Sequence, residues 1–110
     1  LTVTSLRPKR RTQPESARLQ QESAHVLALQ ALAWLAEDAE RLTGFLGASG
    51  IAPGSLRDMA GDEEVLGAVL DHLLLDDQWV IAFCDQHGLP YSAPLAARAA
   101  LPGGDATHWT

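Results

Sequence analysis

The residues most able to do chemistry in this chain gather in one short stretch, DHLLLDDQWVIAFCDQHG, residues 71–88. On a helix, His72 with Asp76 (i, i+4) and Cys84 with His87 (i, i+3) would each share a face, as paired metal ligands do. A structural zinc site uses four ligands, typically two close pairs of cysteine or histidine. The chain has one cysteine and four histidines in all, and two of those histidines are distant in sequence. We therefore expect no metal site and no cofactor.

Nucleophilic catalysis by Cys84 is the second chemistry that the stretch suggests. A reactive thiol needs an electropositive, partly exposed setting that lowers its pKa. Cys84 instead stands between Phe83 and Asp85 in an apolar helix, where burial and negative charge raise the pKa of a thiol. The adjacent Asp76 and Asp77 are typical of a helix N-terminus, where acids accept unpaired N–H groups and favour the positive end of the dipole. An enzyme or metal-binding protein that uses this stretch is the least favoured function, and we expect no enzymatic activity.

The elements that must position these residues are helices. Apolar residues recur at helical spacing along the chain, and no window alternates as a strand does. The pattern predicts an all-α protein, a compact bundle of about six helices. We expect helices over residues 15–38, 39–48, 53–60, a stretch capped by Asp62 with its apolar stripe at 65–74, then 76–88 and 92–101. Residues 1–14 are expected to form a disordered basic tail, 15–104 a single helical domain, and 105–110 a frayed C-terminal tail.

An internal repeat links the two halves of the predicted bundle. Residues 27–51 align without a gap to residues 65–89. The identical pairs fall at core positions and at helix ends: Leu32 with Leu70, Leu35 with Leu73, Asp38 with Asp76, Phe45 with Phe83, and Gly50 with Gly88. We interpret the chain as two pseudo-repeated three-helix units, in which Asp38 and Asp76 are structural N-caps. The alternative is that any two amphipathic helical hairpins resemble each other to this degree.

Charge is divided unevenly along the chain. Residues 1–22 carry +3, and residues 23–110 carry −9, which gives the net charge of −6. Four basic residues precede the first predicted helix: Arg7, Lys9, Arg10 and Arg11. They would contact nucleic acid by releasing counterions from phosphates. The tail has no interleaved aromatic residues for base stacking and leads into an acidic body, so a solvated tail is favoured over nucleic-acid binding.

The first predicted helix is apolar on almost every side, and this bears on partners. Its second half, HVLALQALAWLAED, has more apolar surface than one helix needs to face a single core. We expect the surplus, with Leu29 and Trp34 on it, to meet a second protein chain, most simply in a C2 homodimer. Trp79 is a further candidate contact, because tryptophan is enriched in binding hot spots. The alternative is a monomer in which this helix runs through the middle of the bundle.

The segments ALQALAWLAED, FLGASGIAPGSLR and LLLDDQWVIAFCDQHGLP resemble a family of small bacterial proteins of unknown function, over about residues 24–104. The resemblance implies a compact intracellular helical domain and supplies no activity. No apolar run approaches the ~20 residues of a membrane span, and residues 1–14 lack the apolar core of a signal peptide. With a single cysteine, we expect a cytoplasmic protein. The favoured function is a non-enzymatic protein-interaction or regulatory module whose partner is unidentified; nucleic-acid association through the tail is the alternative.

Overall fold

The computed structural model describes the backbone of residues 15–101 and the side chains of residues 18–101. The described chain is helical and contains no strand. Its elements are α2 (Glu15–Ala36), α3 (Ala39–Ser49), the 3-10 helix η2 (Pro53–Ser55) leading into α4 (Leu56–Met59), α5 (Glu63–Leu74), α6 (Asp77–His87) and α7 (Ala93–Ala100). The predicted all-α bundle of six helices is confirmed. The predicted tail contacts Arg7, Lys9, Arg10 and Arg11 lie outside the described residues.

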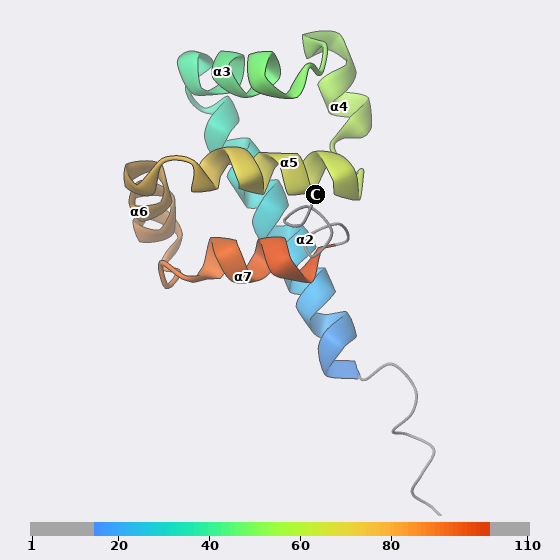
Figure 1. Ribbon diagram of the computed structural model, residues 1–110, viewed down its shortest axis with the longest axis vertical. Helices are drawn as coiled ribbons and strands as arrows, with labels where there is room; N and C mark the ends of the chain where they lie inside the picture. Colours follow the sequence, from blue (N-terminus) through green and yellow to red (C-terminus); the bar gives the residue numbers. More distant parts are fainter. Residues whose placement is uncertain (1–14, 102–110) are drawn as a thin grey trace, which may run out of the picture.

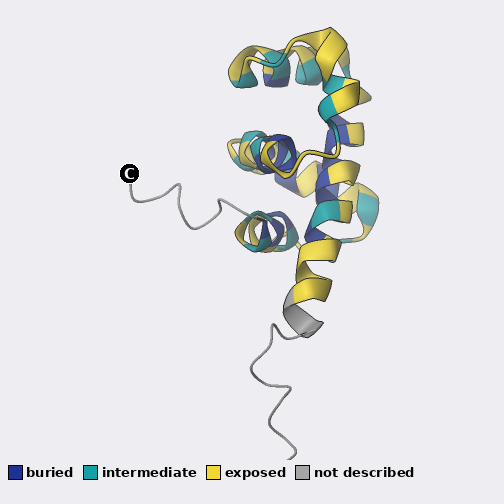
Figure 2. Ribbon diagram, turned by 90° about the vertical axis from the view of Figure 1, so that its right-hand side faces the viewer, coloured by how far each residue is buried: buried dark blue, intermediate teal, exposed yellow. Residues whose placement is uncertain are grey.

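Helix α2 is the central element, and its 22 residues give it a length of about 33 Å. It crosses behind α5 and α7, and its upper end lies just below α3 (Figure 1). Those three helices are stacked one above another along the same side of α2 (Figure 2). On this side α2 presents Ala28, Ala31 and Leu35, which are fully buried. Small alanine side chains let the crossing helices approach closely, while the opposite side of α2 remains open to solvent.

Helix α5 fills the middle of the bundle. Its spacing of apolar residues buries one continuous face against α2, and Leu66, Val69, Leu70 and Leu73 are fully buried there. Phe45 of α3 and Phe83 with Cys84 of α6 belong to the same core. The stripe that the sequence predicted for this helix is therefore the face on which the core is built.

Helix α7 is fastened to α5 by a buried guanidinium. Arg98 donates from Nε to Asp71 Oδ1 at 2.7 Å and from Nη2 to Asp71 Oδ2 at 3.2 Å. The guanidinium lies over Gly67 of α5, where a Cβ atom would stand 3.0 Å from Nη1. A side chain at position 67 would displace the arginine. Glycine at this position therefore allows Arg98 to form both hydrogen bonds with Asp71.

Equivalent caps begin and end α3 and α6. Asp38 accepts the backbone N–H groups of Glu40 and Arg41, and Asp76 accepts those of Gln78 and Trp79. Both aspartates have extended backbone angles, as an N-cap residue does. The helices end at Gly50 and Gly88, whose φ angles of 78° and 66° lie in the left-handed region that glycine adopts without strain.

The third elements of the two predicted units differ. Helix α4 has four residues, whereas α7 has eight and packs along both α2 and α5. The matched caps are local features that any helical hairpin of this length can share. The duplication of a three-helix unit therefore stays a prediction.

Among the described residues, no helix is both long enough and apolar enough to cross a bilayer.

Replacing either capping aspartate by alanine should lower the free energy of unfolding by about 1 kcal/mol, because two N–H groups of the first turn lose their acceptor. Denaturant unfolding of Asp38→Ala and Asp76→Ala, followed by circular dichroism, measures the loss. Gln86→Ala, an exposed change in α6, is the matched control and should leave the midpoint unchanged. An Asp76→Ala protein as stable as the parent would show that this cap does not stabilise α6.

Candidate functional site

Four polar side chains of residues 71–88 make separate structural contacts: Asp71, Asp76, Asp85 and His87. Asp85 accepts a hydrogen bond of 2.7 Å from the hydroxyl of Tyr91. The ring of His87 is tilted over Phe83 with 4.5 Å between centroids, and its Nδ1 lies 3.1 Å from the Phe83 carbonyl oxygen. No group of three His, Cys, Asp or Glu side chains in the described part of the chain is arranged to hold a metal ion. The stretch spans the end of α5 and all of α6, and these contacts do not bring its polar side chains together into one site.

Cys84 is fully buried in the core, next to Phe83. Burial raises the pKa of its thiol above the ordinary value, and the negative charge of Asp85 raises it further. Both effects disfavour the thiolate, which is the nucleophilic form. The side chain fills space as a small apolar residue would.

His72 lies in an aromatic cluster. Its ring meets Phe45 edge-on at 5.6 Å and Trp79 at 5.5 Å between centroids. Both ring nitrogens are inaccessible to solvent and have no hydrogen-bond partner among the described residues. The pairing of His72 with Asp76 that the sequence suggested is absent, because Asp76 directs its carboxylate to the first turn of α6. The histidine serves as an aromatic ring between α3, α5 and α6.

The prediction that Trp34 lies on an interaction surface is wrong. Trp34 is 5% exposed and meets Trp79 and Phe83 edge-on at 5.9 and 6.0 Å. Arg41 covers its outer side, with the guanidinium carbon 3.8 Å from the ring centroid. Trp34 therefore links α2 to α6 through buried aromatic contacts. Trp79 is half-buried in the same cluster.

Leu29 remains partly accessible, at 37% exposed, on the side of α2 that faces η2 and α4. A shallow depression there is lined by Leu29, Leu32, Ala33, Ala36, Pro53, Gly54, Leu56, Arg57, Asp58 and Ala60. Its rim carries one basic and one acidic side chain, which would have to be desolvated by an apolar partner. Leu29 stays a predicted contact residue.

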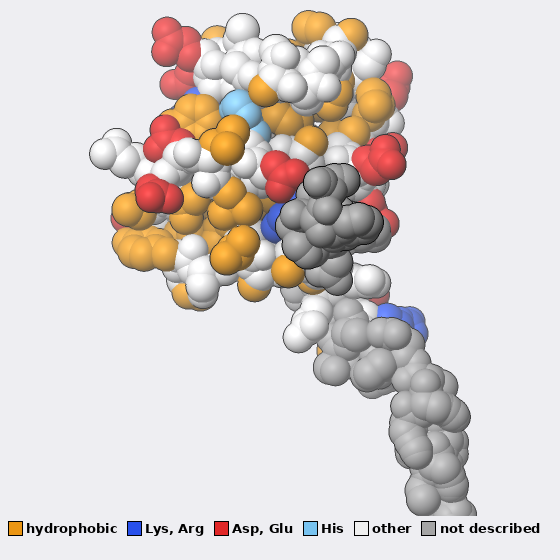
Figure 3. All heavy atoms as spheres, viewed as in Figure 1, with side chains coloured by type: hydrophobic (Ala, Val, Ile, Leu, Met, Phe, Trp, Pro, Cys, Tyr) orange, Lys and Arg blue, Asp and Glu red, His pale blue; other side chains and the backbone are white. Residues whose placement is uncertain are grey.

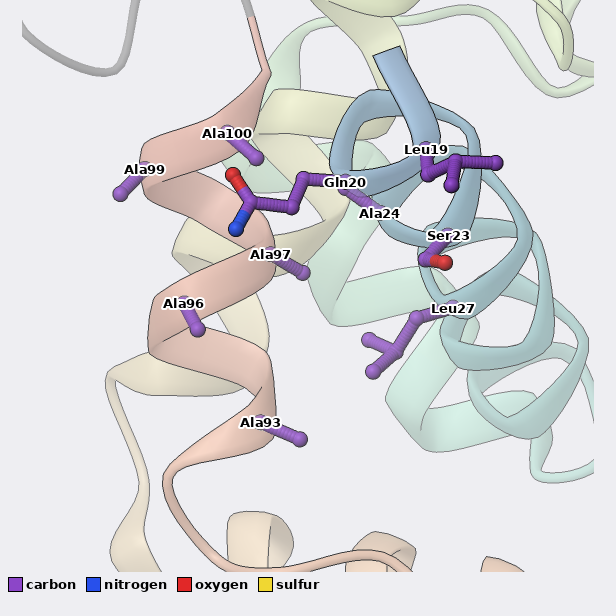
Figure 4. A pocket seen from close by; sticks show the side chains of 10 residues that line it. All are labelled: Leu19, Gln20, Ser23, Ala24, Leu27, Ala93, Ala96, Ala97, Ala99 and Ala100. Carbon is purple, nitrogen blue, oxygen red and sulfur yellow. The ribbon is translucent and has the colours of Figure 1, made fainter. Parts of the chain in front are cut away.

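A second groove lies between the N-terminal half of α2 and α7, and we call it the α2–α7 groove (Figure 4). Its volume is about 600 Å³. It is lined by Leu19, Gln20, Ser23, Ala24, Leu27, Ala93, Ala96, Ala97, Ala99 and Ala100. None of these side chains is charged, and five of the ten are alanines of α7. Gln20 and Ser23 are the only polar side chains of the lining, so the groove suits the binding of apolar surface.

The solvent side of α7 continues this apolar surface. Leu95, Ala96 and Ala99 are its exposed side chains after the proline turn, and we call them the α7 outer face. Arg98, the only charged residue of α7, turns inward to Asp71. Figure 3 shows apolar side chains gathered over the lower part of this face of the molecule, with acidic side chains over the upper part. A surface helix normally turns charged residues to water, so an uncharged outer face is typical of a contact surface.

Sequence reasoning missed this groove for an identifiable reason. The segment APLAARAA predicted a helix, but an alanine-rich helix has no strong apolar stripe to mark which side is buried. Its one usable signal was Arg98, because a lone charge among alanines indicates either the solvent side or a specific buried partner. The partner, Asp71, is 27 residues away in sequence.

Native Cys84 should react slowly with Ellman's reagent, because the buried thiol with its raised pKa has to await an opening of the core. Absorbance at neutral pH measures the labelling. In native protein the thiol should be labelled at the rate at which the core opens, and in guanidinium-unfolded protein it should be labelled at once. Rapid labelling of the folded chain would contradict the buried position of the thiol.

His72→Phe should raise the free energy of unfolding by about 1 kcal/mol, because a phenyl ring keeps the aromatic contacts and removes two ring nitrogens that have no partner. Chemical denaturation measures the change. His87→Phe is the matched control: it loses the contact of Nδ1 with the Phe83 carbonyl and should not stabilise the protein. A less stable His72→Phe protein would indicate that the imidazole has a polar partner.

Neither the curated proteins nor the solved structures give a match to the chain. A family model described as "Protein of unknown function (DUF3572)" matches residues 21–104, which include every described helix except the first turns of α2. This match covers well over half of the sequence, so the chain belongs to the DUF3572 family of proteins of unknown function.

Proposed function

We propose that this protein is a non-enzymatic protein-interaction or regulatory module, and that its binding surface is the α2–α7 groove together with the α7 outer face. The observation that carries the proposal is the absence of charge from this surface on an otherwise acidic body. All ten groove residues are uncharged, although residues 23–110 carry a net charge of −9. The proposal includes a cytoplasmic location, where a single cysteine stays reduced.

The energetic argument favours a protein as the occupant. Leu19 is 60% exposed on the rim of the groove, and Leu27 forms part of the lining. Each Å² of apolar surface removed from water contributes roughly 25 cal/mol. The alanine side chains of α7 lose almost no side-chain entropy when covered, so a partner helix can approach them closely at low cost. A shallow groove with one wall of alanines fits the side chains of a helix better than a small polar ligand, for which it offers few hydrogen-bonding groups.

Site-directed photo-crosslinking in the native cell tests this function. A benzoylphenylalanine at Ala96, which is exposed in the groove, should give a discrete crosslinked protein species. The same residue at Ala82, an exposed alanine of α6 outside the groove, is the matched control and should give none. Equal crosslinking at the two positions, or no protein adduct at position 96, would contradict the assigned surface.

A further inference from the structure

Residues 52–61, which contain η2 and α4, join α3 to α5 along the edge of the bundle, and we call them the α4 strap (Figure 1). Every other described helix buries at least one side chain, but η2 and α4 bury none. The hydrophobic side chains of the strap that pack against the core are Leu56 and Ala60, and both are half-buried. An element held by so little apolar contact belongs to the least stable parts of a structure.

Polar side chains do not fasten the strap to its neighbours. Among the described residues, no side-chain hydrogen bond or ion pair involves residues 52–61. Neither η2 nor α4 has a side-chain N-cap, whereas α3, α5 and α6 each begin at a capping aspartate. The amide of Ser55 donates to the Ala52 carbonyl at 2.9 Å. The amide of Ala60 donates to the Arg57 carbonyl at 3.4 Å. These two bonds close within the strap, so they can break while α3 and α5 keep theirs.

The inner side of the strap is incompletely packed against α2. The depression between the two has a volume of about 700 Å³. Of the α2 side chains in its lining, Leu32 is buried and the others are exposed: Leu29, Ala33 and Ala36. Where atoms do not meet, no dispersion contact is lost on separation. The strap can therefore leave α2 with little loss of contact.

We propose that the α4 strap opens and closes as a unit while the other helices stay folded, and that its opening adds Leu32 to the exposed apolar side chains of α2. Phe45 and Val65 are the nearest buried residues on the two sides of the strap, and they hold α3 and α5 in the core. The strap is thus a conformational switch that sets how much apolar surface α2 presents on this side. The α2–α7 groove is lined by other residues, so the opening leaves it unchanged.

Native-state hydrogen exchange measures the opening. The amides of Ser55 and Ala60 should be roughly 100-fold less protected than those of Leu70 and Leu73 in α5, because they exchange without global unfolding. Guanidinium below the unfolding transition should speed exchange of the α5 amides and leave the strap amides unchanged, since a local opening exposes little surface. Equal protection of the two pairs, or equal dependence on guanidinium, would show that the strap opens only with the whole bundle and would overturn the proposal.

Three variants separate the strap from the bundle. Gly54→Ala should raise the protection of the strap amides roughly 2- to 5-fold, because a Cβ there meets nothing within 4 Å and alanine restricts the open chain. Gly47→Ala in α3, where a Cβ is equally free, is the matched control and should leave the strap amides unchanged. Asp76→Ala should lower the protection of the α5 amides about 5-fold and leave the strap amides unchanged, because the open and closed strap lose the same cap. Strap amides that follow Asp76→Ala, or that do not respond to Gly54→Ala, contradict an independent opening.

Thiol labelling tests the uncovering of α2. In Leu32→Cys, Ellman's reagent should label position 32 in a fast phase set by strap opening, and Cys84 in the slow phase set by opening of the core. Gly54→Ala should slow the fast phase by the same factor of roughly 2 to 5, and Gly47→Ala should not. Circular dichroism of each variant should match the parent. A single slow phase for both thiols, or a fast phase that Gly54→Ala leaves unchanged, overturns the uncovering of α2 by the strap.

Discussion

The packing of three helices against one side of α2 is the constraint on which the rest of the structure depends. The alanines on this side let α3, α5 and α7 approach closely, and they leave the opposite side of the helix in water (Figure 2). A core this thin cannot also cover the solvent side of α7. The uncharged outer face of that helix follows from the same arrangement, because its single arginine is used to hold α7 to α5.

The polar residues that first suggest chemistry serve helix boundaries and helix contacts. Asp76 caps α6, His87 lies in its last turn, and Asp71 holds Arg98. His72 is the exception, since its ring nitrogens are buried without partners among the described residues. Its value to the fold is its flat ring, which packs between Phe45 and Trp79 at the junction of three helices. A cluster of acids, histidines and cysteine in a sequence is therefore compatible with a purely structural role when each falls at a helix end or in an aromatic contact.

A groove without charged side chains, on a chain of net charge −6, is suited to contact with another apolar surface. The apolar groove supplies the area that can be removed from water, and the surrounding acids keep the remainder of the surface soluble and disfavour contacts elsewhere. Membership of the DUF3572 family assigns no reaction to the chain.

The sequence by itself determined the helices and their ends. Caps such as Asp38 and Gly50 act within one helical turn, so their effect is readable from neighbouring residues, and the observed helices begin and end close to the predicted positions. Only the tertiary structure decided which apolar residues of α2 were covered: Trp34 is buried, whereas Leu19 and Val26 are exposed. All three look equally suited to a core in sequence. Their exposure depends on where α7 and α6 lie against α2. Contacts between residues far apart in the chain determine those positions, so no local sequence pattern predicts them.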